Sequence, residues 1–301
     1  AYDFTKAALE AGKSVVTSNK EVVAEKGAEL IQIAKDKNLN YLFEASVGGG
    51  IPIIRPLHQC LAANEVISIY GILNGTTNYI LTEMIKKGKG FEEALADAQQ
   101  KGYAERNPSA DVDGVDSCRK ICILASLAFG RHVYPAGIKT EGIRDISLID
   151  VKYAKALHGV IKLIGQTKQL PDGRVFAMVS PCIVDLDSPI AVVDDVFNCI
   201  LVKGDAIGDV MFYGRGAGKL PTASAVVADI IDEVKHIEAR KYLFWKDSDK
   251  DSAVDYREIK NKFFVRLSGC DKAPAAFGNV EYVDAIVLPG EIAFIIDDIA
   301  E

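Results

Sequence analysis

Apolar residues recur every three or four positions along several stretches of the chain, and that spacing is typical of amphipathic helices. In residues 21–37 the repeat falls on Val22, Ala28, Ile31 and Ile33. In residues 115–129 the run ICILASLAF is apolar at almost every position, which predicts a buried helix. The same analysis predicts helices at residues 51–63, 75–88, 91–101 and 222–241, the first of these kinked at Pro56.

Strands are indicated by short apolar or alternating runs. In the first half of the chain these runs cover residues 14–17, 41–45 and 65–73, and they alternate with helices. The second half is richer in strands, at residues 160–167, 175–184 and 199–214. The last 40 or so residues follow the order strand, turn, strand, strand. Together the helices and strands predict an α/β or α+β fold.

The chain opens in the middle of such a pattern. Its first residues, AYDFTKAALEAGK, predict an amphipathic helix that ends near Gly12, and the strand at residues 14–17 follows at once. A strand is expected before the first helix of an α/β unit. We therefore expect that the chain was processed or that a preceding strand lies upstream.

Length and composition limit the classes of protein. A chain of 301 residues is longer than one ordinary core, which predicts two domains or one domain with an appendage. Its 35 Lys and Arg against 42 Asp and Glu give a net charge of −7, which disfavours nucleic acid and anionic membranes as partners. Apolar runs are too short for a membrane helix, and six scattered cysteines are typical of reduced thiols in the cytoplasm.

The glycine-rich segment GRGAGKLP matches no phosphate-binding motif. A Walker A loop needs glycine where Tyr213 stands and Ser or Thr where Leu220 stands, and a dinucleotide loop needs glycine in place of Lys219. The segment still leads from a strand into a helix, whose first backbone N–H groups favour an anion. A tight turn explains the glycines equally well, so both interpretations stay open at this point.

Metal-binding patterns are incomplete as well. Cys118 and Cys122 lie one helical turn apart, but no second pair completes a zinc site, so buried thiols are the better interpretation. The four histidines form no cluster and are interpreted as structural. An acidic run has the spacing of a calcium loop at Asp247, Asp249, Asp251, Asp255 and Glu258. Because Ser252 replaces the turn glycine of such a loop, a solvated charged linker is the better interpretation.

One segment carries candidate acid–base chemistry. Residues 102–114 form a polar loop with Glu105 and Asp111, and Asp116 and Lys120 follow in the first turns of the buried helix. Because Asp116 and Lys120 are four residues apart, they share one helix face. Burial disfavours a charged lysine and a carboxylate partner restores it, which suits a general acid or base. The neighbouring carboxylates suit an amino or hydroxyl group of a small polar substrate. An ordinary surface ion pair is the alternative.

The same segment, GYAERNPSADVDGVDSCRKICILA, strongly resembles the signature of homoserine dehydrogenases. Four other motifs occur in the family's order: VVTSNKE, FEASVGGGIPII, GILNGTTNYIL and GRGAGKLPTASAVVADI. The resemblance covers about residues 1–240. It implies the reversible oxidation of L-homoserine to L-aspartate 4-semialdehyde with NAD or NADP, a step on the route to threonine, isoleucine and methionine.

The resemblance also implies roles for individual residues. Lys120 resembles the proton donor and acceptor at the alcohol oxygen, and Lys20 a second lysine near the nicotinamide and the substrate. The positions that match substrate-binding residues are Glu105, Asp111, Asp116, Thr76 and Tyr103. The positions that approach the cofactor are Gly102 and Gly218. A monovalent-cation site for sodium or potassium, built partly of backbone carbonyls, corresponds to Glu44, Val47, Gly49 and Ile51.

A division into four parts follows from the same resemblance. Residues 1–45 correspond to the end of a Rossmann-type nucleotide-binding domain, and residues 46–241 to a mixed-sheet domain for substrate binding, catalysis and oligomerisation. Residues 242–261 are the charged linker, and residues 262–301 resemble part of an ACT-like unit. The family's glycine-rich pyrophosphate loop has no counterpart here, so we expect this chain by itself to bind the cofactor weakly and to be impaired as an enzyme. A homodimer or homotetramer is also implied.

Two other functions compete with this interpretation. A semialdehyde dehydrogenase of the same route needs a nucleophilic cysteine with a histidine base, and none of the six cysteines lies in a recognisable nucleophile turn. A non-catalytic amino-acid-binding or oligomerisation module derived from the family would not need the missing loop. The complete acid–base set from Glu105 to Lys120 favours the enzyme, because a scaffold does not require it.

Overall fold

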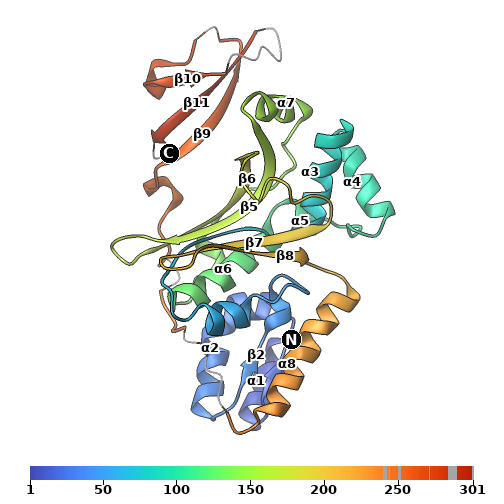
Figure 1. The fold of residues 1–301 in the computed structure, drawn as a ribbon, viewed down its shortest axis with the longest axis vertical. Coiled ribbons are helices and arrows are strands. Elements are labelled where there is room, and N and C mark those ends of the chain that lie inside the picture. The colour runs from blue at the N-terminus through green and yellow to red at the C-terminus, as the bar shows by residue number, and fades with distance from the viewer. Residues whose placement is uncertain (240–242, 244, 250–251, 271, 284–289, 300–301) are drawn as a thin grey trace.

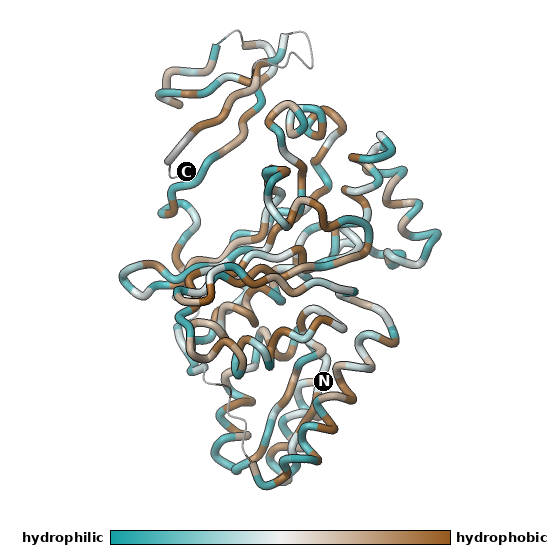
Figure 2. Tube along the Cα trace, viewed as in Figure 1, coloured by the Kyte–Doolittle hydropathy of each residue, from teal (hydrophilic) through white to brown (hydrophobic). Residues whose placement is uncertain are grey.

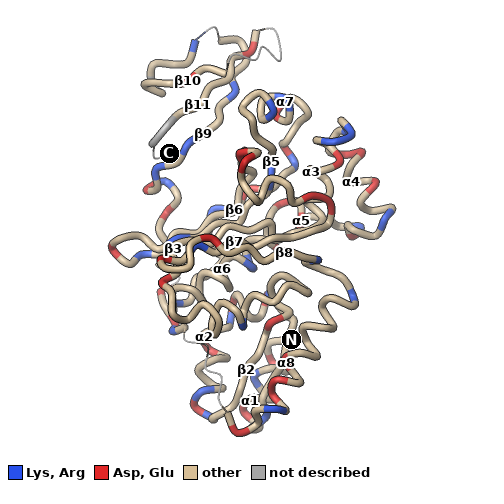
Figure 3. Tube along the Cα trace, viewed as in Figure 1, with Lys and Arg blue, Asp and Glu red and all other residues tan. Residues whose placement is uncertain are grey.

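A computed structural model describes residues 1–239, 243, 245–249, 252–270, 272–283 and 290–299. Its elements form three layers (Figure 1): helices around two short strands near the N-terminus, a central sheet with its own helices, and a small C-terminal sheet. Acidic and basic residues are interspersed along the trace in each layer (Figure 3). Among the described residues, no helix has the length and apolar character needed to cross a membrane.

The N-terminal layer consists of α1 (Tyr2–Glu10), β1 (Val15–Val16), α2 (Lys20–Asp36) and β2 (Tyr41–Leu42). The two strands pair in parallel, with Val15 opposite Tyr41. Helix α8 (Lys219–Lys235) returns from the second half of the chain and packs against this layer (Figure 1). The sequence predicted these elements in this order. Strand β2 is shorter than predicted because the chain turns into a 3₁₀ helix at Glu44–Ser46.

The central sheet has the strand order β4–β6–β5–β3–β7–β8. Its strands are β3 (Val66–Ile72), β4 (Lys139–Thr140), β5 (Gly159–Gln169), β6 (Val175–Asp185), β7 (Phe197–Gly204) and β8 (Gly208–Arg215). Neighbouring strands are antiparallel except β4 and β6, which are parallel. This arrangement confirms the predicted α/β (α+β) class with a mixed sheet.

The helices of the central layer are α3 (Gly75–Lys87), α4 (Phe91–Gln100), α5 (Ser109–Val112), α6 (Val115–Phe129) and α7 (Leu148–Ala156). Helix α6 packs on β3, β5 and β6, and its residues 120–127 are all buried, as the apolar run predicted. Gly165 on β5 permits this close approach, because a Cβ there would lie 3.3 Å from the Cβ of Ile121. Hydrophobic residues recur along the trace of the central sheet and of α6 (Figure 2).

Three predicted elements differ from the structure. In place of a helix over residues 51–63 there is one turn of π-helix at Pro56–Cys60, because Pro56 has no N–H and the N–H groups before it bond to Glu44. The loop at residues 102–114 contains the short helix α5. Helix α8 begins at Lys219, three residues earlier than predicted, and ends at Lys235; residues 240 and 241 of the prediction lie outside the described residues.

The segment predicted as a solvated linker, residues 242–261, is anchored by buried apolar side chains. Trp245 is 4 % exposed, lies 5.6 Å from the ring of Phe43 and occupies the space above Gly27 of α2. The backbone N–H of Lys246 donates to Gly130 O at 3.1 Å, and the N–H of His132 donates to Lys246 O at 2.8 Å. The prediction of a solvated linker is therefore wrong for these residues, because the charge run hides its apolar anchors.

The calcium-loop spacing does not bring the described carboxylates of that run to one point. Asp247 accepts a hydrogen bond from the Tyr134 hydroxyl at 2.7 Å, and Glu258 pairs with Arg174 at 2.9 Å. Asp255 pairs with Arg257 at 2.5 Å. Asp251 lies outside the described residues.

The C-terminal sheet consists of β9 (Asn261–Ser268), β10 (Val280–Tyr282) and β11 (Glu291–Ile299), in the order β10–β11–β9 and antiparallel throughout. It is tied to α7 by Arg266, which donates to Asp150 at 2.6 Å. The three strands match the predicted pattern of this part of the chain, and its ACT-like identity stays a prediction.

Candidate active site

The ion pair between Asp116 and Lys120 lies at the start of α6, with Lys120 Nζ 2.7 Å from Asp116 Oδ2. Asp116 is 4 % exposed and Lys120 is 7 % exposed. Lys120 also donates to the carbonyl oxygen of Leu73, the residue after β3, at 2.7 Å. The pair is therefore buried and bonded on both sides, which distinguishes it from the surface ion pair that the spacing alone allowed.

A second lysine reaches the same carboxylate from the N-terminal layer. Lys20 is the first residue of α2, and its Nζ lies 2.5 Å from Asp116 Oδ1. Its side chain is 42 % exposed, so it faces solvent where Lys120 does not. Burial by itself raises the pKa of Asp116, but the ammonium groups of Lys120 and Lys20 outweigh this effect and hold that pKa well below its usual range.

Asn74 joins this carboxylate to a second one. It is the N-cap of α3, and its Oδ1 accepts the N–H of Thr77 at 2.9 Å. Its Nδ2 donates to Asp111 Oδ1 at 2.7 Å and to Asp116 Oδ2 at 2.9 Å. Burial raises the pKa of Asp111, and the nearby charge of Asp116 raises it further. Asn74 was not predicted as a site residue, because an uncharged side chain gives no sign of contacts this far along the chain.

The loop after α4 lies beside the first turn of α3. Thr76 Oγ1 donates to Tyr103 O at 2.6 Å, and the ring of Tyr103 meets that of Tyr79 edge-on at 5.1 Å. Gly102 has a φ of 73°, a left-handed conformation that favours glycine. The carboxylate of Glu105 is exposed and makes no hydrogen bond to the residues that the structure describes.

The predicted acid–base residues thus fall into two groups. Lys20, Asp111, Asp116 and Lys120 form one hydrogen-bonded network with Asn74, although they come from three helices. Thr76 and Tyr103 adjoin it through the first turn of α3, whereas Glu105 stands apart from it in this structure. Such a network can hold or move a proton at Lys120 and offers carboxylates to a cationic group.

Two glycine-rich loops pack directly on each other. The N–H of Gly50 donates to Arg215 O at 3.2 Å, and a Cβ at Gly49 would overlap the carbonyl of Gly216. Gly218 follows as the N-cap of α8, with a φ of 123°. A shallow, open depression lies at this end of α8, lined by Gly218, Lys219, Thr222, Ala223, Val226 and Val227. A helix N-terminus beside a lysine suits an anionic group, in line with one of the two interpretations left open above.

The turn after β2 carries the residues matched to a cation site. Its residues 44–49 are buried, and Glu44 Oε1 accepts the N–H groups of Ile53 at 2.6 Å and Ile54 at 2.8 Å. Glu44 Oε2 accepts the N–H of Arg55 at 2.9 Å. The carboxylate of Glu44 is therefore already bonded to the backbone. Within the described residues, the carbonyl oxygens of Val47, Gly49 and Ile51 accept no hydrogen bond.

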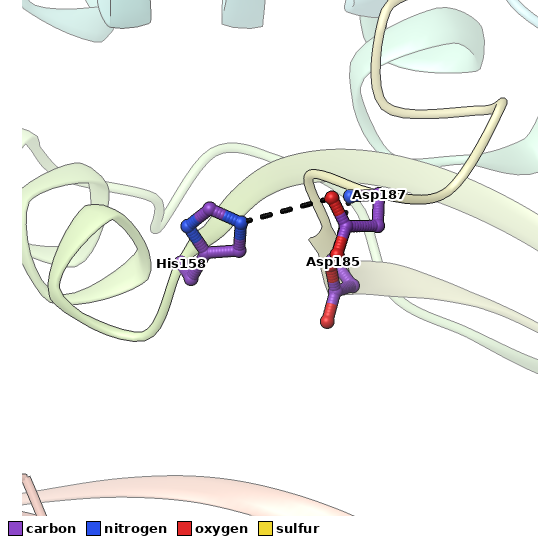
Figure 4. A group of neighbouring side chains, drawn as sticks. All are labelled: His158, Asp185 and Asp187. Carbon is purple, nitrogen blue, oxygen red and sulfur yellow. Dashed lines mark hydrogen bonds and ion pairs between the residues drawn. The ribbon is translucent and has the colours of Figure 1, made fainter.

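Other candidate metal ligands lie away from this network. Cys118 and Cys122 are buried free thiols, as predicted. Within the described part of the chain, one group of three side chains has metal-ligand proximity: His158, Asp185 and Asp187, where β5 begins and β6 ends (Figure 4). All three are exposed, and His158 Nε2 lies 3.9 Å from Asp187 Oδ1. This group was not predicted, because its members are distant along the chain.

Comparisons with known proteins agree with the motifs. Residues 52–231 match the family model described as homoserine dehydrogenase. A homoserine dehydrogenase of Synechocystis is 49 % identical over 246 residues, which are 81 % of this chain and 55 % of that protein. The chain thus spans about half the length of this curated relative.

Solved structures give the same result. The structure of a homoserine dehydrogenase from Thiobacillus denitrificans is similar with a TM-score of 0.86 at 36 % identity, over 98 % of this chain and 71 % of that one. A hyperthermophilic archaeal homoserine dehydrogenase in complex with NADPH is similar with a TM-score of 0.70 at 32 % identity, over 81 % of this chain and 70 % of that one.

Proposed function

The chain belongs to the homoserine dehydrogenase family, and from this we propose that it carries out the reversible NAD(P)-dependent oxidation of L-homoserine to L-aspartate 4-semialdehyde. In this role it serves the synthesis of threonine, methionine and isoleucine. The observation that carries the proposal is the buried network of Lys120, Asp116 and Lys20, with Asp111 joined to it through Asn74. An ion pair needed only for stability would not require four charged groups from three helices at one point.

The reaction assigns a task to each charged group. Oxidation of the alcohol removes a proton from the hydroxyl oxygen and a hydride from the carbinol carbon. We assign the proton to Lys120 Nζ, which Asp116 and the Leu73 carbonyl hold in place. Asp111 and Asp116 are assigned to the substrate's amino and hydroxyl end, and Thr76 and Tyr103 to the wall beside it. Glu105 belongs to this set only if its loop turns inward when substrate binds.

NADP or NAD supplies the hydride acceptor when bound. The residues assigned to it are Lys20, Gly102 and Gly218. Support comes from the positive φ of both glycines, and from the shallow depression at the N-terminus of α8, where Gly218 and Lys219 offer backbone N–H groups and a positive charge to a phosphate. The archaeal relative in complex with NADPH supports the same class of cofactor.

We also propose a monovalent cation, sodium or potassium, at the turn after β2. The unused carbonyls of Val47, Gly49 and Ile51 are hard oxygen donors in a buried turn, which suits such an ion. Because the carboxylate of Glu44 is bonded to three backbone N–H groups, this residue would take part through its carbonyl. The ion would fix the contact between the two glycine-rich loops.

The division into residues 1–45, 46–241, 242–261 and 262–301 is part of the proposal, with catalysis assigned to the second part and Lys20 contributed by the first. A homodimer or homotetramer is supported by exposed apolar side chains along α8, among them Val227, Ile230, Ile231 and Val234. Light scattering on the purified chain tests the oligomer. Six free cysteines support a cytoplasmic location.

The deciding experiment is homoserine-dependent formation of NADH or NADPH, measured on this chain and on a longer product that adds the part of the Synechocystis relative that this chain does not cover. Turnover by either one supports the proposal, and turnover by the longer product alone adds that this chain is impaired. Folded protein with no turnover in both cases would overturn the proposal in favour of a binding or oligomerisation module.

A further inference from the structure

We propose that Asn74 is a positioning residue of the active site, which holds Asp111 and Asp116 side by side and keeps them oriented toward the substrate. The inference rests on the proposed function. Nδ2 of Asn74 donates to both carboxylates, at 2.7 Å to Asp111 and 2.9 Å to Asp116. Asn74 is buried, and it is the only residue of the described network that contacts both carboxylates.

The hydrogen bonds from Asn74 reduce the repulsion between two neighbouring carboxylates. Asp111 and Asp116 are like charges that share one amide group, so each disfavours the ionised form of the other. Lys120 and Lys20 compensate Asp116 directly. Among the described residues, no lysine or arginine lies within ion-pair distance of Asp111. Its carboxylate accepts a short hydrogen bond from the amide of Asn74. Without that amide, Asp111 would lose its hydrogen-bond donor, and the more distant charges of Lys120 and Lys20 would be left to offset burial and the like charge of Asp116.

Capping a helix does not by itself explain asparagine at this position. An N-cap needs one acceptor, and Ser, Thr or Asp provide it equally well. Asn19 caps α2 in this way, with its Oδ1 accepting the N–H of Val22 at 2.9 Å. Asn74 does the same for Thr77 and in addition uses its amide N–H groups on the two carboxylates. Of the residues that cap helices well, only asparagine supplies both an acceptor and two donors.

The position in the fold links both halves of the network. Leu73, the residue before Asn74, accepts from Lys120 at 2.7 Å. Leu73 and Asn74 are adjacent and lie between β3 and α3. The carbonyl of Leu73 holds the ammonium group of Lys120, and the amide of Asn74 holds the two carboxylates. Any shift of this junction would move the proton-carrying lysine and its carboxylates together, so the junction keeps their geometry fixed.

The test uses Asn74→Asp, which keeps the capping acceptor but removes both donors and adds a third carboxylate. We expect the variant to fold and its kcat/KM for L-homoserine to fall about 10- to 100-fold, the loss that a hydrogen bond to a charged group brings. The acidic limb of its pH profile should move to higher pH, because the pKa of Asp111 rises further. Asn74→Ser, which caps without an added charge, should move the limb in the same direction by less.

A second measurement does not depend on turnover. Carbon-13 NMR of the Asp111 carboxyl, assigned with Asp111→Asn, follows its titration in the chain itself with and without the Asn74 substitutions. The matched control is Ser147→Ala, which removes the N-cap of α7; among the described residues the Ser147 side chain bonds to Asp150 and Arg266 and to no member of the network. It should lower the unfolding temperature and leave both the pH profile and the Asp111 titration unchanged.

The outcomes separate the two proposals. If neither this chain nor the longer product oxidises homoserine, the proposed function is refuted, while the Asp111 titration still tests the inference. A wild-type titration of Asp111 in both Asn74→Asp and Asn74→Ser would overturn the inference, because the amide would then serve only as a cap. If Asn74→Asp fails to fold, the titration in Asn74→Ser decides in the same way.

Discussion

Two lysines are buried beside α3, and their surroundings differ. Lys120 meets Asp116 at 2.7 Å, and that carboxylate is shared with Lys20, which reaches solvent. Lys162, on β5, is 0 % exposed and donates to Val193 O at 2.6 Å and to Asp194 at 3.2 Å. Lys120 thus belongs to a group of charged side chains that reaches solvent through Lys20. Lys162 is enclosed, and it bonds to the backbone of the loop that contains Val193.

The second cluster shows what a structural use of buried charge looks like. Asn78, one turn after Asn74 on α3, donates to the carbonyls of Val193, Asp195 and Phe197, each at 3.1 Å. Lys162 adds its ammonium to the same loop, and Asp194 keeps a second partner in Lys86 at 2.6 Å. The three contacts of Asn78 and the contact of Lys162 with Val193 O hold the backbone of this loop. In the Lys120 network the carboxylates are held by side chains, so they stay available to a ligand.

The largest expected effect is on turnover, and it belongs to Lys120. Lys120→Met should lower kcat for homoserine oxidation by about 10²- to 10⁴-fold, because the proton acceptor at the alcohol oxygen is gone. Lys20 still compensates Asp116, so circular dichroism should show a folded protein. A variant that turns over at the wild-type rate would exclude Lys120 as the proton acceptor, and Lys120 would then have a structural role like that of Lys162.

Lys162→Met should show the opposite balance. The carbonyl of Val193 loses its charged donor, and the free energy of unfolding should fall by about 1–3 kcal/mol. Asp194 keeps Lys86, so no carboxylate is left alone. Denaturant titration measures the stability, and kcat per folded molecule should stay near the wild-type value. A large loss of kcat with unchanged stability would contradict the structural role.

A pH experiment sharpens the same contrast. Burial lowers the pKa of Lys162 below its usual 10.5, and Asp194 offsets only part of the shift. Between the lowered value and 10.5 the unfolded chain binds more protons than the folded chain, so this group makes the free energy of unfolding rise with pH. Lys162→Met should remove that rise. Equal slopes for both proteins, measured by denaturant titration at several pH values below 10.5, would contradict the prediction.

The smallest effect is expected from Lys86→Ala. Its side chain is 58 % exposed, and exposed ion pairs contribute little. The free energy of unfolding should change by no more than about 0.5 kcal/mol, and turnover should not change. A loss as large as that of Lys162→Met would mean that Asp194, and not the ammonium of Lys162, holds the loop.

Local patterns predicted the parts of the molecule that depend on local spacing. The four-residue interval between Asp116 and Lys120, followed by an apolar run, was enough to predict a buried helix with an ion pair at its start. Asn74 was invisible as a partner because its contacts lie 37 and 42 residues away. Lys162 was hidden inside the apolar strand VIKLIGQT, and nothing in that strand indicates the carbonyls of a loop 31 residues later.

The same limit explains the errors. The charge density of residues 242–261 predicted a solvated linker. Trp245 is nevertheless buried, because its indole packs over Gly27 of helix α2, more than 200 positions earlier. The helix predicted over residues 51–63 is shorter in the structure. The N–H groups of residues 53–55 donate to the carboxylate of Glu44 and not to the carbonyls of a preceding helical turn. Both errors come from contacts between separate segments of the chain, and the spacing of apolar residues within one segment does not predict such contacts.

Trp245 has a further consequence, because it is the only tryptophan in the 301 residues. Its indole lies against Phe43 and 5.7 Å from the ring of His132, at the joint between the N-terminal layer and the segment that leads to the C-terminal sheet. The molecule therefore carries an intrinsic fluorescent reporter of that joint alone. Release of the segment would shift the emission to longer wavelength while the far-ultraviolet circular dichroism of the chain changed little, so local detachment and global melting can be observed as separate signals.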